Sequence, residues 1–298
     1  GIFFRFDKND INIVKVVKLN KFPFYGWLGI FLIILFWILN WSLEGLRTHW
    51  GFFPLWLGYC LTIDALVLLR KGSSMINRNP FIYTLLFVMS VPVWWLFEFF
   101  NGITQNWFYI GSESFSDAEY FLLASLSFST VMPAVLGTAE LAGTFKWIKN
   151  LHQGLRIGTE KKTLLILFLS GCIMLLLLII FPEIFYSMLW ISLYLIIDSI
   201  NAAAGNNSLL LFTKNGDWRV IFSLFAGCMI CAFFWEMWNF YSYPKWVYYL
   251  PYVNVLKIFE MPLPGYIGYF PFSLEIFALY NFITGWLRKE SFRNFLKI

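Results

Sequence analysis

Two short polar motifs interrupt the most aromatic stretches of the chain. In the stretch WWLFEFFNGITQNWFY, Glu98 is followed three residues later by Asn101. In the stretch FFWEMWNFYSYPKWVYY, Glu236 and Asn239 have the same spacing. Because residues three apart lie on nearly the same face of a helix, each glutamate projects together with its asparagine. Each motif therefore predicts a carboxyl group beside an amide on one face of an aromatic helix.

The chemistry open to Glu98 and Glu236 depends on whether they share one cavity. Two carboxyl groups in one low-dielectric pocket disfavour each other's charge, so that one can keep its proton and act as a general acid. The neighbouring tryptophans, Trp95, Trp235 and Trp238, are typical of the aromatic belt at a membrane interface, and they are candidates for ligand binding. In the alternative interpretation, each glutamate and asparagine only anchors the loop that follows its helix.

Two aspartates lie in the inner halves of other apolar segments. Asp64 occurs in GYCLTIDALVLL and Asp198 in SLYLIIDSINAA. An ionisable residue inside a membrane span is costly and is a candidate functional residue by default. We therefore expect Asp64 and Asp198, together with Glu98 and Glu236, as candidate catalytic residues. Pairing with an arginine or capping of a neighbouring helix is the alternative role for the aspartates.

Three further polar residues are candidates for ligand binding. Asn101 and Asn239 accompany their glutamates, and Glu275 lies in the last apolar segment of the chain. No metal and no cofactor are expected, because the only two histidines fall in loops on opposite sides of the predicted membrane. Cys228 and Cys231 form a C-x-x-C motif, but free cysteine in an apolar helix is a small packing residue.

The composition places these residues in a membrane protein. The chain of 298 residues is 59% hydrophobic and 13% charged, whereas soluble domains are about 25% charged. A helix that crosses a bilayer needs about 20 mostly apolar residues. Segments of this kind occur at 24–43, 52–70, 80–100, 119–145, 163–181, 184–203, 218–240 and 264–288. The sequence therefore predicts an all-α integral membrane protein with about eight transmembrane helices.

The basic residues predict the orientation of these helices. Of the 22 Lys and Arg residues, all but Arg47, Lys245 and Lys257 fall in the tails and in the loops on one side. Since basic loops stay in the cytoplasm, both termini are predicted to be cytoplasmic, in a bacterial inner membrane. The net charge of +5 then reflects topology, and no nucleic-acid partner is expected. The expected partners are membrane lipids, a lipophilic small molecule and other membrane subunits.

The polar residues recur in a way that indicates an internal duplication. Asp64 and Asp198 are 134 residues apart, and Glu98 and Glu236 are 138 residues apart. Insertions in loops produce such a slowly growing offset, whereas chance matches would scatter. Because each half has an even number of spans, we expect two tandem four-helix repeats related by a pseudo-two-fold axis along the membrane normal, with a site at their interface. The predicted parts are a cytoplasmic segment (1–22), a first repeat (23–150), a basic linker (151–162), a second repeat (163–290) and a cytoplasmic tail (291–298).

Three motifs follow one another in the second half of the chain: an acidic residue after tryptophan, a Trp-x-aromatic motif, and a proline followed by a carboxylate. They are WEMWN with Trp235 and Glu236, KWVYY with Trp246 and Tyr248, and PFSLE with Pro271 and Glu275; the first half has counterparts at Glu98, Trp107 and Tyr109. In these motifs the chain resembles the lycopene-cyclase domain, a duplicated membrane domain of carotenoid enzymes, although the family's adjacent acidic pair after the proline is absent. The resemblance implies a polyene-like ligand. The chain also looks like bacterial polytopic membrane proteins with no assigned role.

Three functions remain open on the sequence. Carboxylates framed by aromatic residues favour a membrane-embedded site that binds or transforms an isoprenoid- or polyene-like ligand, because aromatic faces attract cationic intermediates. Aspartates inside spans and the duplication also suit a proton- or ion-coupled transporter. The very apolar segment 163–181 is compatible with a non-catalytic subunit of a larger membrane complex.

Overall fold

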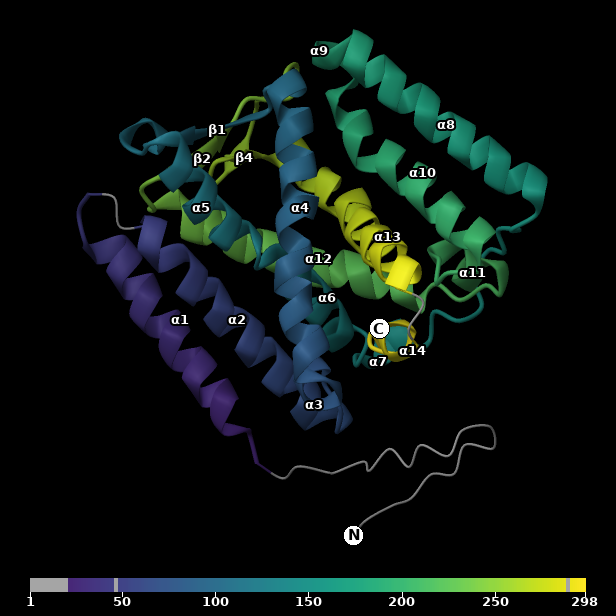
Figure 1. The fold of residues 1–298 in the computed structure, drawn as a ribbon, viewed down its shortest axis with the longest axis horizontal. Helices are drawn as coiled ribbons and strands as arrows, with labels where there is room; N and C mark the ends of the chain where they lie inside the picture. Colours follow the sequence, from purple (N-terminus) through teal and green to yellow (C-terminus); the bar gives the residue numbers. More distant parts are fainter. Residues whose placement is uncertain (1–20, 46–47, 288–289) are drawn as a thin grey trace.

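The computed structural model describes residues 21–45, 48–287 and 290–298, which fold mostly into helices (Figure 1). The helices are α1 (Phe24–Ser42), α2 (Thr48–Lys71), α3 (Met75–Arg78), α4 (Pro80–Thr104), α5 (Asp117–Phe128), α6 (Val131–Ala142), α7 (Lys146–Lys149), α8 (Lys161–Ile180), α9 (Pro182–Phe185), α10 (Leu189–Ala204), α11 (Leu209–Lys214), α12 (Arg219–Phe240), α13 (Tyr269–Leu287) and α14 (Glu290–Arg293). Two antiparallel pairs of short strands are added to them: β1 (Trp107–Ile110) with β2 (Lys245–Tyr248), and β3 (Lys257–Ile258) with β4 (Met261–Pro262). The predicted helical class is confirmed.

Seven segments of the described chain are long and apolar enough to cross a membrane. They are Phe24–Ser42, His49–Lys71, Pro80–Thr104, Asp117–Ala142, Lys161–Ile180, Pro182–Ala204 and Arg219–Phe240. These segments correspond to the first seven that the sequence predicts, and they support a multi-pass membrane protein. The eighth predicted segment, 264–288, forms α13, which is not among the seven. α13 carries the polar side chains of Glu275, Asn281 and Thr284, which are buried in the protein interior.

The fourth predicted segment consists of two helices rather than one. α5 and α6 are separated by Ser129 and Thr130. At this break the hydroxyl of Ser90, on α4, donates to the carbonyl of Phe128 (2.6 Å) and accepts from the backbone N–H of Met132 (3.1 Å). Neighbouring helices have to satisfy backbone groups that a break frees inside a membrane, and Ser90 does so here.

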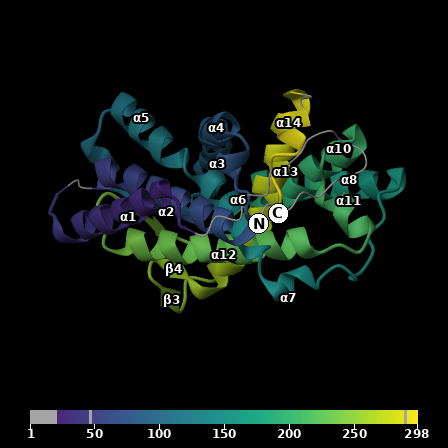
Figure 2. The same ribbon diagram turned by 90° about the horizontal axis from the view of Figure 1, so that it is seen from below.

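The helices form two outer pairs around a central group. α1 packs on α2 and α8 packs on α10, and α4, α6, α12 and α13 lie between the two pairs (Figures 1 and 2). A glycine permits close contact in each outer pair. A Cβ on Gly29 would lie 2.7 Å from the carbonyl oxygen of Gly58, and a Cβ on Gly171 would lie 2.7 Å from that of Ser192. Small residues bring membrane helices together in the same way generally.

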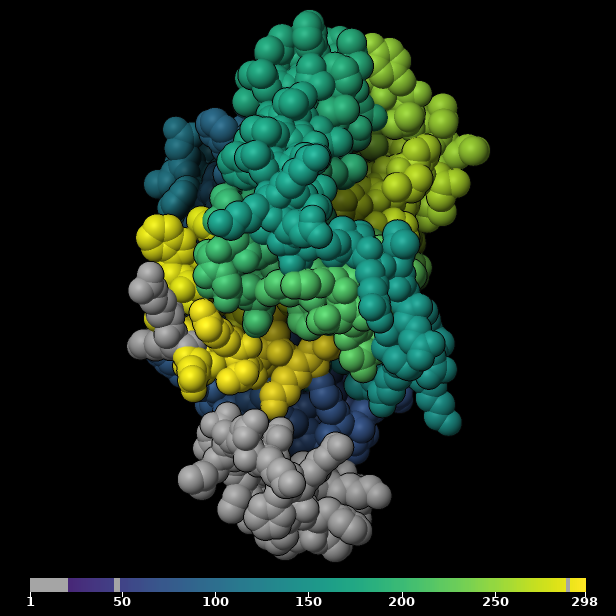
Figure 3. All heavy atoms as spheres, turned by 90° about the vertical axis from the view of Figure 1, so that its right-hand side faces the viewer, coloured from purple at the N-terminus to yellow at the C-terminus, as the bar shows by residue number. Residues whose placement is uncertain are grey.

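The outer helix α8 presents an apolar surface. Leu165, Ile173 and Leu176 are each more than half exposed, at 56%, 57% and 55%. Segments coloured teal to green, which include α8 and α10, make up the upper part of this face of the molecule (Figure 3). So extended an apolar surface requires an apolar environment, which lipid acyl chains provide.

Asp64 and Asp198 each hold the turn that follows their helix. Asp64 accepts hydrogen bonds from Ser74 Oγ (2.7 Å) and from a backbone N–H of α3 (3.1 Å). Asp198 accepts from Ser208 Oγ (2.8 Å) and from two backbone N–H groups of α11 (3.1 Å each). The first N–H groups of a helix lack intrahelical partners, and side-chain oxygens commonly supply them. Both aspartates thus stabilise the start of a neighbouring short helix.

Removing the carboxylate of Asp198 is expected to destabilise the protein. Asp198→Ala leaves the buried backbone N–H of Leu209 without its acceptor, at a cost of about 1–3 kcal/mol, whereas the N–H of Leu210 keeps Ser208 Oγ as an acceptor. The matched control is Asp217→Ala, because Asp217 accepts only from exposed groups of Arg219, its guanidinium and its backbone N–H. Surface ion pairs contribute only about 0–1 kcal/mol, and water can replace an acceptor at an exposed N–H. Thermal unfolding in detergent should show a clearly larger loss for Asp198→Ala; equal losses would contradict the capping role.

Candidate functional site

The two strands that follow the Glu-x-x-Asn motifs pair with each other across the molecule. In this ribbon of β1 and β2, Trp107 lies opposite Tyr248 and Tyr109 lies opposite Trp246. Successive residues of a strand point to opposite faces, and directly paired residues point to the same face. The four aromatic side chains therefore share one face of the ribbon. Phe108 points to the other face and is 46% exposed.

The asparagine of each motif positions the strand that follows it. Asn101 accepts hydrogen bonds from the backbone N–H groups of Asn106 (2.9 Å) and Trp107 (3.2 Å), and its amide donates to the Trp107 carbonyl (2.8 Å). Asn239 accepts from the backbone N–H of Trp246 (2.9 Å) and donates to the carbonyl of the same residue (2.7 Å). Both asparagines are therefore anchors between a helix end and the ribbon.

Glu98 is held by three aromatic donors, all at one carboxyl oxygen. Its Oε1 accepts from Trp94 Nε1 (2.8 Å), from Trp107 Nε1 (3.0 Å) and from the Tyr109 hydroxyl (2.5 Å). Trp94 belongs to the same helix as Glu98, whereas the other two donors belong to β1. The carboxyl group thereby fixes the inner face of the ribbon to α4.

Glu236 has a related arrangement on α12, with different donors and one free oxygen among the described residues. Its Oε1 accepts from the hydroxyls of Tyr248 (2.8 Å) and Tyr269 (2.6 Å), and Trp246 Nε1 donates to the Tyr248 oxygen (2.8 Å). Glu236 is completely buried, and its Oε2 has no hydrogen-bond partner among the described residues. One oxygen of this carboxyl group is thus committed to the ribbon and to α13, and the other is not.

The ribbon tyrosines in these contacts stay protonated. Burial, followed by the charge of Glu98, raises the pKa of Tyr109 well above its usual value. Burial, followed by the charge of Glu236, raises the pKa of Tyr248 in the same direction. A protonated phenol is a hydrogen-bond donor, so both tyrosines remain donors to their carboxyl groups at neutral pH.

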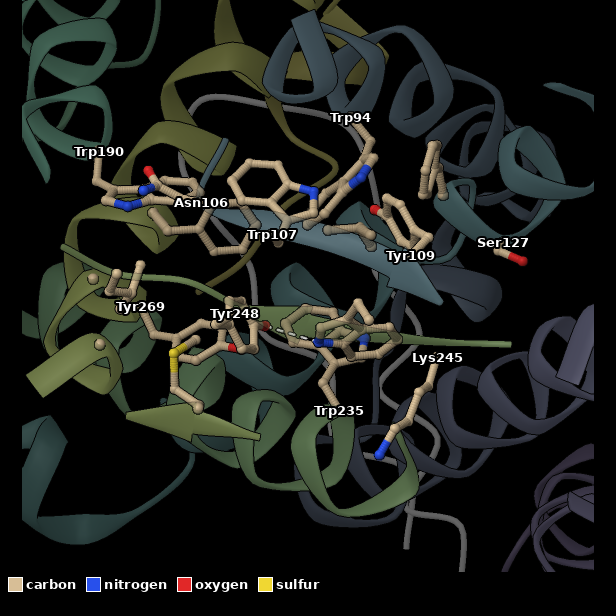
Figure 4. Close-up of a pocket in the computed structure, with 18 of the residues that line it drawn as sticks. Trp94, Asn106, Trp107, Tyr109, Ser127, Trp190, Trp235, Lys245, Tyr248 and Tyr269 are labelled. Carbon is tan, nitrogen blue, oxygen red and sulfur yellow. Dashed lines mark hydrogen bonds between the residues drawn. The ribbon is translucent and has the colours of Figure 1, made fainter. Parts of the chain in front are cut away.

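A cavity of about 590 Å³ lies beside the ribbon and takes its wall from both halves of the sequence. The aromatic residues of this wall in the described chain are Trp94, Trp107, Trp190, Trp235, Trp246, Tyr109, Tyr120, Tyr186, Tyr248, Tyr269, Phe52, Phe115, Phe128 and Phe272. Figure 4 shows the rings in two tiers, one with Trp190, Trp107, Trp94 and Tyr109 and one with Tyr269, Tyr248 and Trp235. Glu98 and Glu236 do not line the cavity but lie behind rings that do.

The carboxyl groups behind the wall have no basic partner. Within the described ranges, neither Glu98 nor Glu236 forms an ion pair with a Lys, Arg or His side chain. Lys245 lines the cavity, but its ammonium group is ion-paired with Glu260. In the same ranges no three His, Cys, Asp or Glu side chains cluster as metal ligands.

The other predicted site residues lie in different surroundings. Trp235 lines the cavity. Trp95 instead stacks on Phe121, with ring centroids 5.1 Å apart, and Trp238 is buried among other aromatic rings. Glu275 is completely buried, and neither of its carboxyl oxygens has a hydrogen-bond partner in the described part of the chain. Asp64 and Asp198 are not part of the cavity wall.

Sequence reasoning missed Tyr269 and Trp190. Tyr269, at the start of α13, donates to Glu236, and Trp190, on α10, lines the cavity. No repeated motif surrounds either residue, so nothing in the local sequence distinguishes them from other aromatic residues. The ribbon residues did have a signal, because a Trp-x-Tyr motif follows each Glu-x-x-Asn motif.

Comparison of the chain with protein-family models, with curated proteins and with solved structures found no match. The function therefore has to be inferred from the geometry of the cavity and its supporting carboxyl groups.

Proposed function

We propose that the protein binds an isoprenoid- or polyene-like lipophilic ligand in the aromatic cavity beside the ribbon. The observation that carries the proposal is the cavity itself, whose wall is built from aromatic rings that Glu98 and Glu236 hold by their polar edges. Ligand sites typically enclose about 300–1,000 Å³ and are mostly apolar with a few fixed polar groups. The cavity of about 590 Å³ falls in this range.

The two remaining functions have less support. Transport was favoured by aspartates inside spans, but Asp64 and Asp198 are engaged with the starts of α3 and α11. Membership of a larger complex was favoured by the apolar α8, but a lipid environment accounts for that surface equally well. The cavity, by contrast, is a feature that ligand binding explains directly.

We propose further that the chain consists of two four-helix halves, with α13 as the eighth membrane crossing. Matched hydrogen bonds support this: Asp64 and Asp198 each accept from a serine ten residues further along. The strand pairing supports it as well. Trp107 corresponds to Trp246 and Tyr109 to Tyr248 in the two halves. A two-fold axis through the ribbon therefore turns the pair Trp107–Tyr248 into the pair Trp246–Tyr109, and both pairs are present.

The ribbon then lies on the side of the membrane opposite to the basic loops. With both termini in the cytoplasm of a bacterial cell, the cavity opens on the outer side of the inner membrane. This orientation follows from the distribution of Lys and Arg residues, and it lets a lipophilic ligand enter from the outer leaflet.

A substitution that fills the cavity is expected to remove the bound ligand without unfolding the protein. Ala124 on α5 lines the cavity, so Ala124→Trp places an indole ring in the space of the ligand. Ala118→Trp is the matched control, because Ala118 is an exposed residue of the same helix outside the wall. Lipids extracted from the protein purified in mild detergent would be identified by mass spectrometry.

We expect one lipophilic compound to be enriched over the bulk membrane lipids in the unsubstituted protein and in Ala118→Trp, and to be depleted at least about tenfold in Ala124→Trp, which corresponds to a loss of about 1.4 kcal/mol in binding. If the extracts of the three proteins do not differ, the cavity is not a ligand site.

A further inference from the structure

We propose that the ligand carries a cationic centre, a quaternary ammonium or a protonated amine, on its apolar body. This inference rests on the proposed function and specifies the charge of the ligand. Three observations lead to it. The carboxyl groups hold the polar edges of the wall rings, these carboxyl groups have no basic partner among the described residues, and Lys245 at the cavity is already ion-paired.

The polar edges of five wall rings are occupied by the two carboxyl groups and are not available to a ligand. An aromatic ring is positive at its N–H or O–H edge and negative on its faces. The edges of Trp94, Trp107 and Tyr109 are bound to Glu98, and those of Tyr248 and Tyr269 are bound to Glu236. What these side chains leave to the cavity is the carbon surface of the rings, and wherever a ring face is accessible it attracts an ammonium group within about 6 Å.

The carboxyl groups of Glu98 and Glu236, behind the rings, attract a cation in addition to the rings themselves. Buried charges in proteins are normally paired, and elsewhere in this chain the buried Glu140 is paired with Arg78 at 2.6 Å. Within the described residues, Glu98 and Glu236 have only hydroxyl and indole donors. A cation in the cavity would stabilise the ionised form of each carboxyl group and supply the counter-charge that the described residues do not place there.

The wall is also unsuited to an anionic head group. Lys245 is its only Lys or Arg residue in the described ranges. Its ammonium group is ion-paired with Glu260, donates to the Phe240 carbonyl (3.3 Å) and lies 5.6 Å from the centre of the Phe240 ring. In Figure 4 this side chain extends away from the two tiers of rings. His49 also lines the cavity and packs against Phe115, with ring centroids 5.5 Å apart. A phosphate or carboxylate in the cavity would therefore find no free ammonium or guanidinium group among the described residues.

The test compares three amphiphiles that share one alkyl chain and differ in the charge of the head group. Decyltrimethylammonium is cationic, decyldimethylphosphine oxide is neutral and decyl sulfate is anionic. Binding to the full chain in nanodiscs of zwitterionic lipid is measured by equilibrium dialysis, with empty nanodiscs subtracted. We expect the cation to bind about tenfold or more tightly than the neutral compound, the scale that desolvated cation–π contacts allow, and the anion to bind most weakly.

Three variants test whether the carboxyl groups cause the preference for the cationic compound. Glu98→Gln and Glu236→Gln keep an oxygen acceptor for the ring donors while removing the charge, so each should reduce the preference for the cation. Glu160→Gln is the control, because Glu160 is an exposed residue whose side chain caps nothing at the start of α8. Loss of the preference in all three variants, or in none, would overturn the assignment.

The comparison on the unsubstituted protein decides the inference even if a variant fails to fold. If the neutral or the anionic compound binds as tightly as the cation, the inference is wrong while the proposed function stands. If none of the three compounds binds and Ala124→Trp leaves the bound lipid unchanged, the proposed function itself fails.

Discussion

Gly227→Ala is expected to lower the unfolding temperature of the protein, whereas Gly102→Ala should leave it unchanged or raise it. Gly227 lies on α12 where this helix packs on α6. A Cβ added there would lie 2.4 Å from the backbone nitrogen of Ala139 and 2.6 Å from its Cα. No flexible side chain is available to move, so the two helices have to separate. Overpacking of this kind costs about 1–3 kcal/mol.

Gly102 provides the matched control because it is also a helical glycine, on α4, but its added Cβ would have nothing within 4 Å. In a helix, alanine is favoured over glycine by about 0.5–1 kcal/mol, since glycine loses more backbone entropy on folding. The two substitutions are therefore expected to change the unfolding temperature in opposite directions. The measurement is the fraction of monodisperse protein that survives heating in detergent, followed by size-exclusion chromatography. A stabilising Gly227→Ala would contradict the close packing of α6 and α12.

Glu236→Leu is expected to destabilise the protein strongly, whereas Glu236→Gln should retain most of its stability. Leucine removes the acceptor to which the Tyr248 and Tyr269 hydroxyls donate, and Tyr248 keeps only the bond that its oxygen accepts from Trp246. Each buried hydroxyl that loses its acceptor costs about 1–3 kcal/mol. Glutamine keeps an oxygen in the same place and can accept from both hydroxyls. Thermal unfolding and limited proteolysis of the segment 241–268, which joins α12 to α13, measure the difference.

The same pair of variants separates anchoring from ligand recognition. If Glu236 only anchors the ribbon, Glu236→Gln keeps both its stability and its bound ligand. If Glu236 also acts on the ligand, Glu236→Gln stays folded but loses ligand. Glu160→Leu serves as the control for introducing an apolar side chain in place of an exposed carboxylate. A Glu236→Leu variant as stable as this control would show that the two tyrosine contacts contribute little.

Local features of the site could be predicted from the sequence because they depend on short stretches of chain. The Glu-x-x-Asn spacing places both side chains on one helix face, and Asn101 and Asn239 indeed reach the strand that begins six residues later. The roles of Asp64 and Asp198 were left open, because the spacing alone does not reveal that each turn folds back onto its aspartate.

By itself, the sequence determined the class of the protein and the positions of seven apolar helices, because the free energy of burying apolar surface depends on composition and length. Only the tertiary structure decided which residues surround the cavity. β1 meets β2 from the other half of the chain, and Tyr269 and Trp190 join them from α13 and α10. Such contacts depend on how whole helices pack, and close approach at glycines such as Gly227 sets that packing. The aromatic wall is therefore a property of the folded chain, whereas the carboxyl groups that orient it are visible in the sequence.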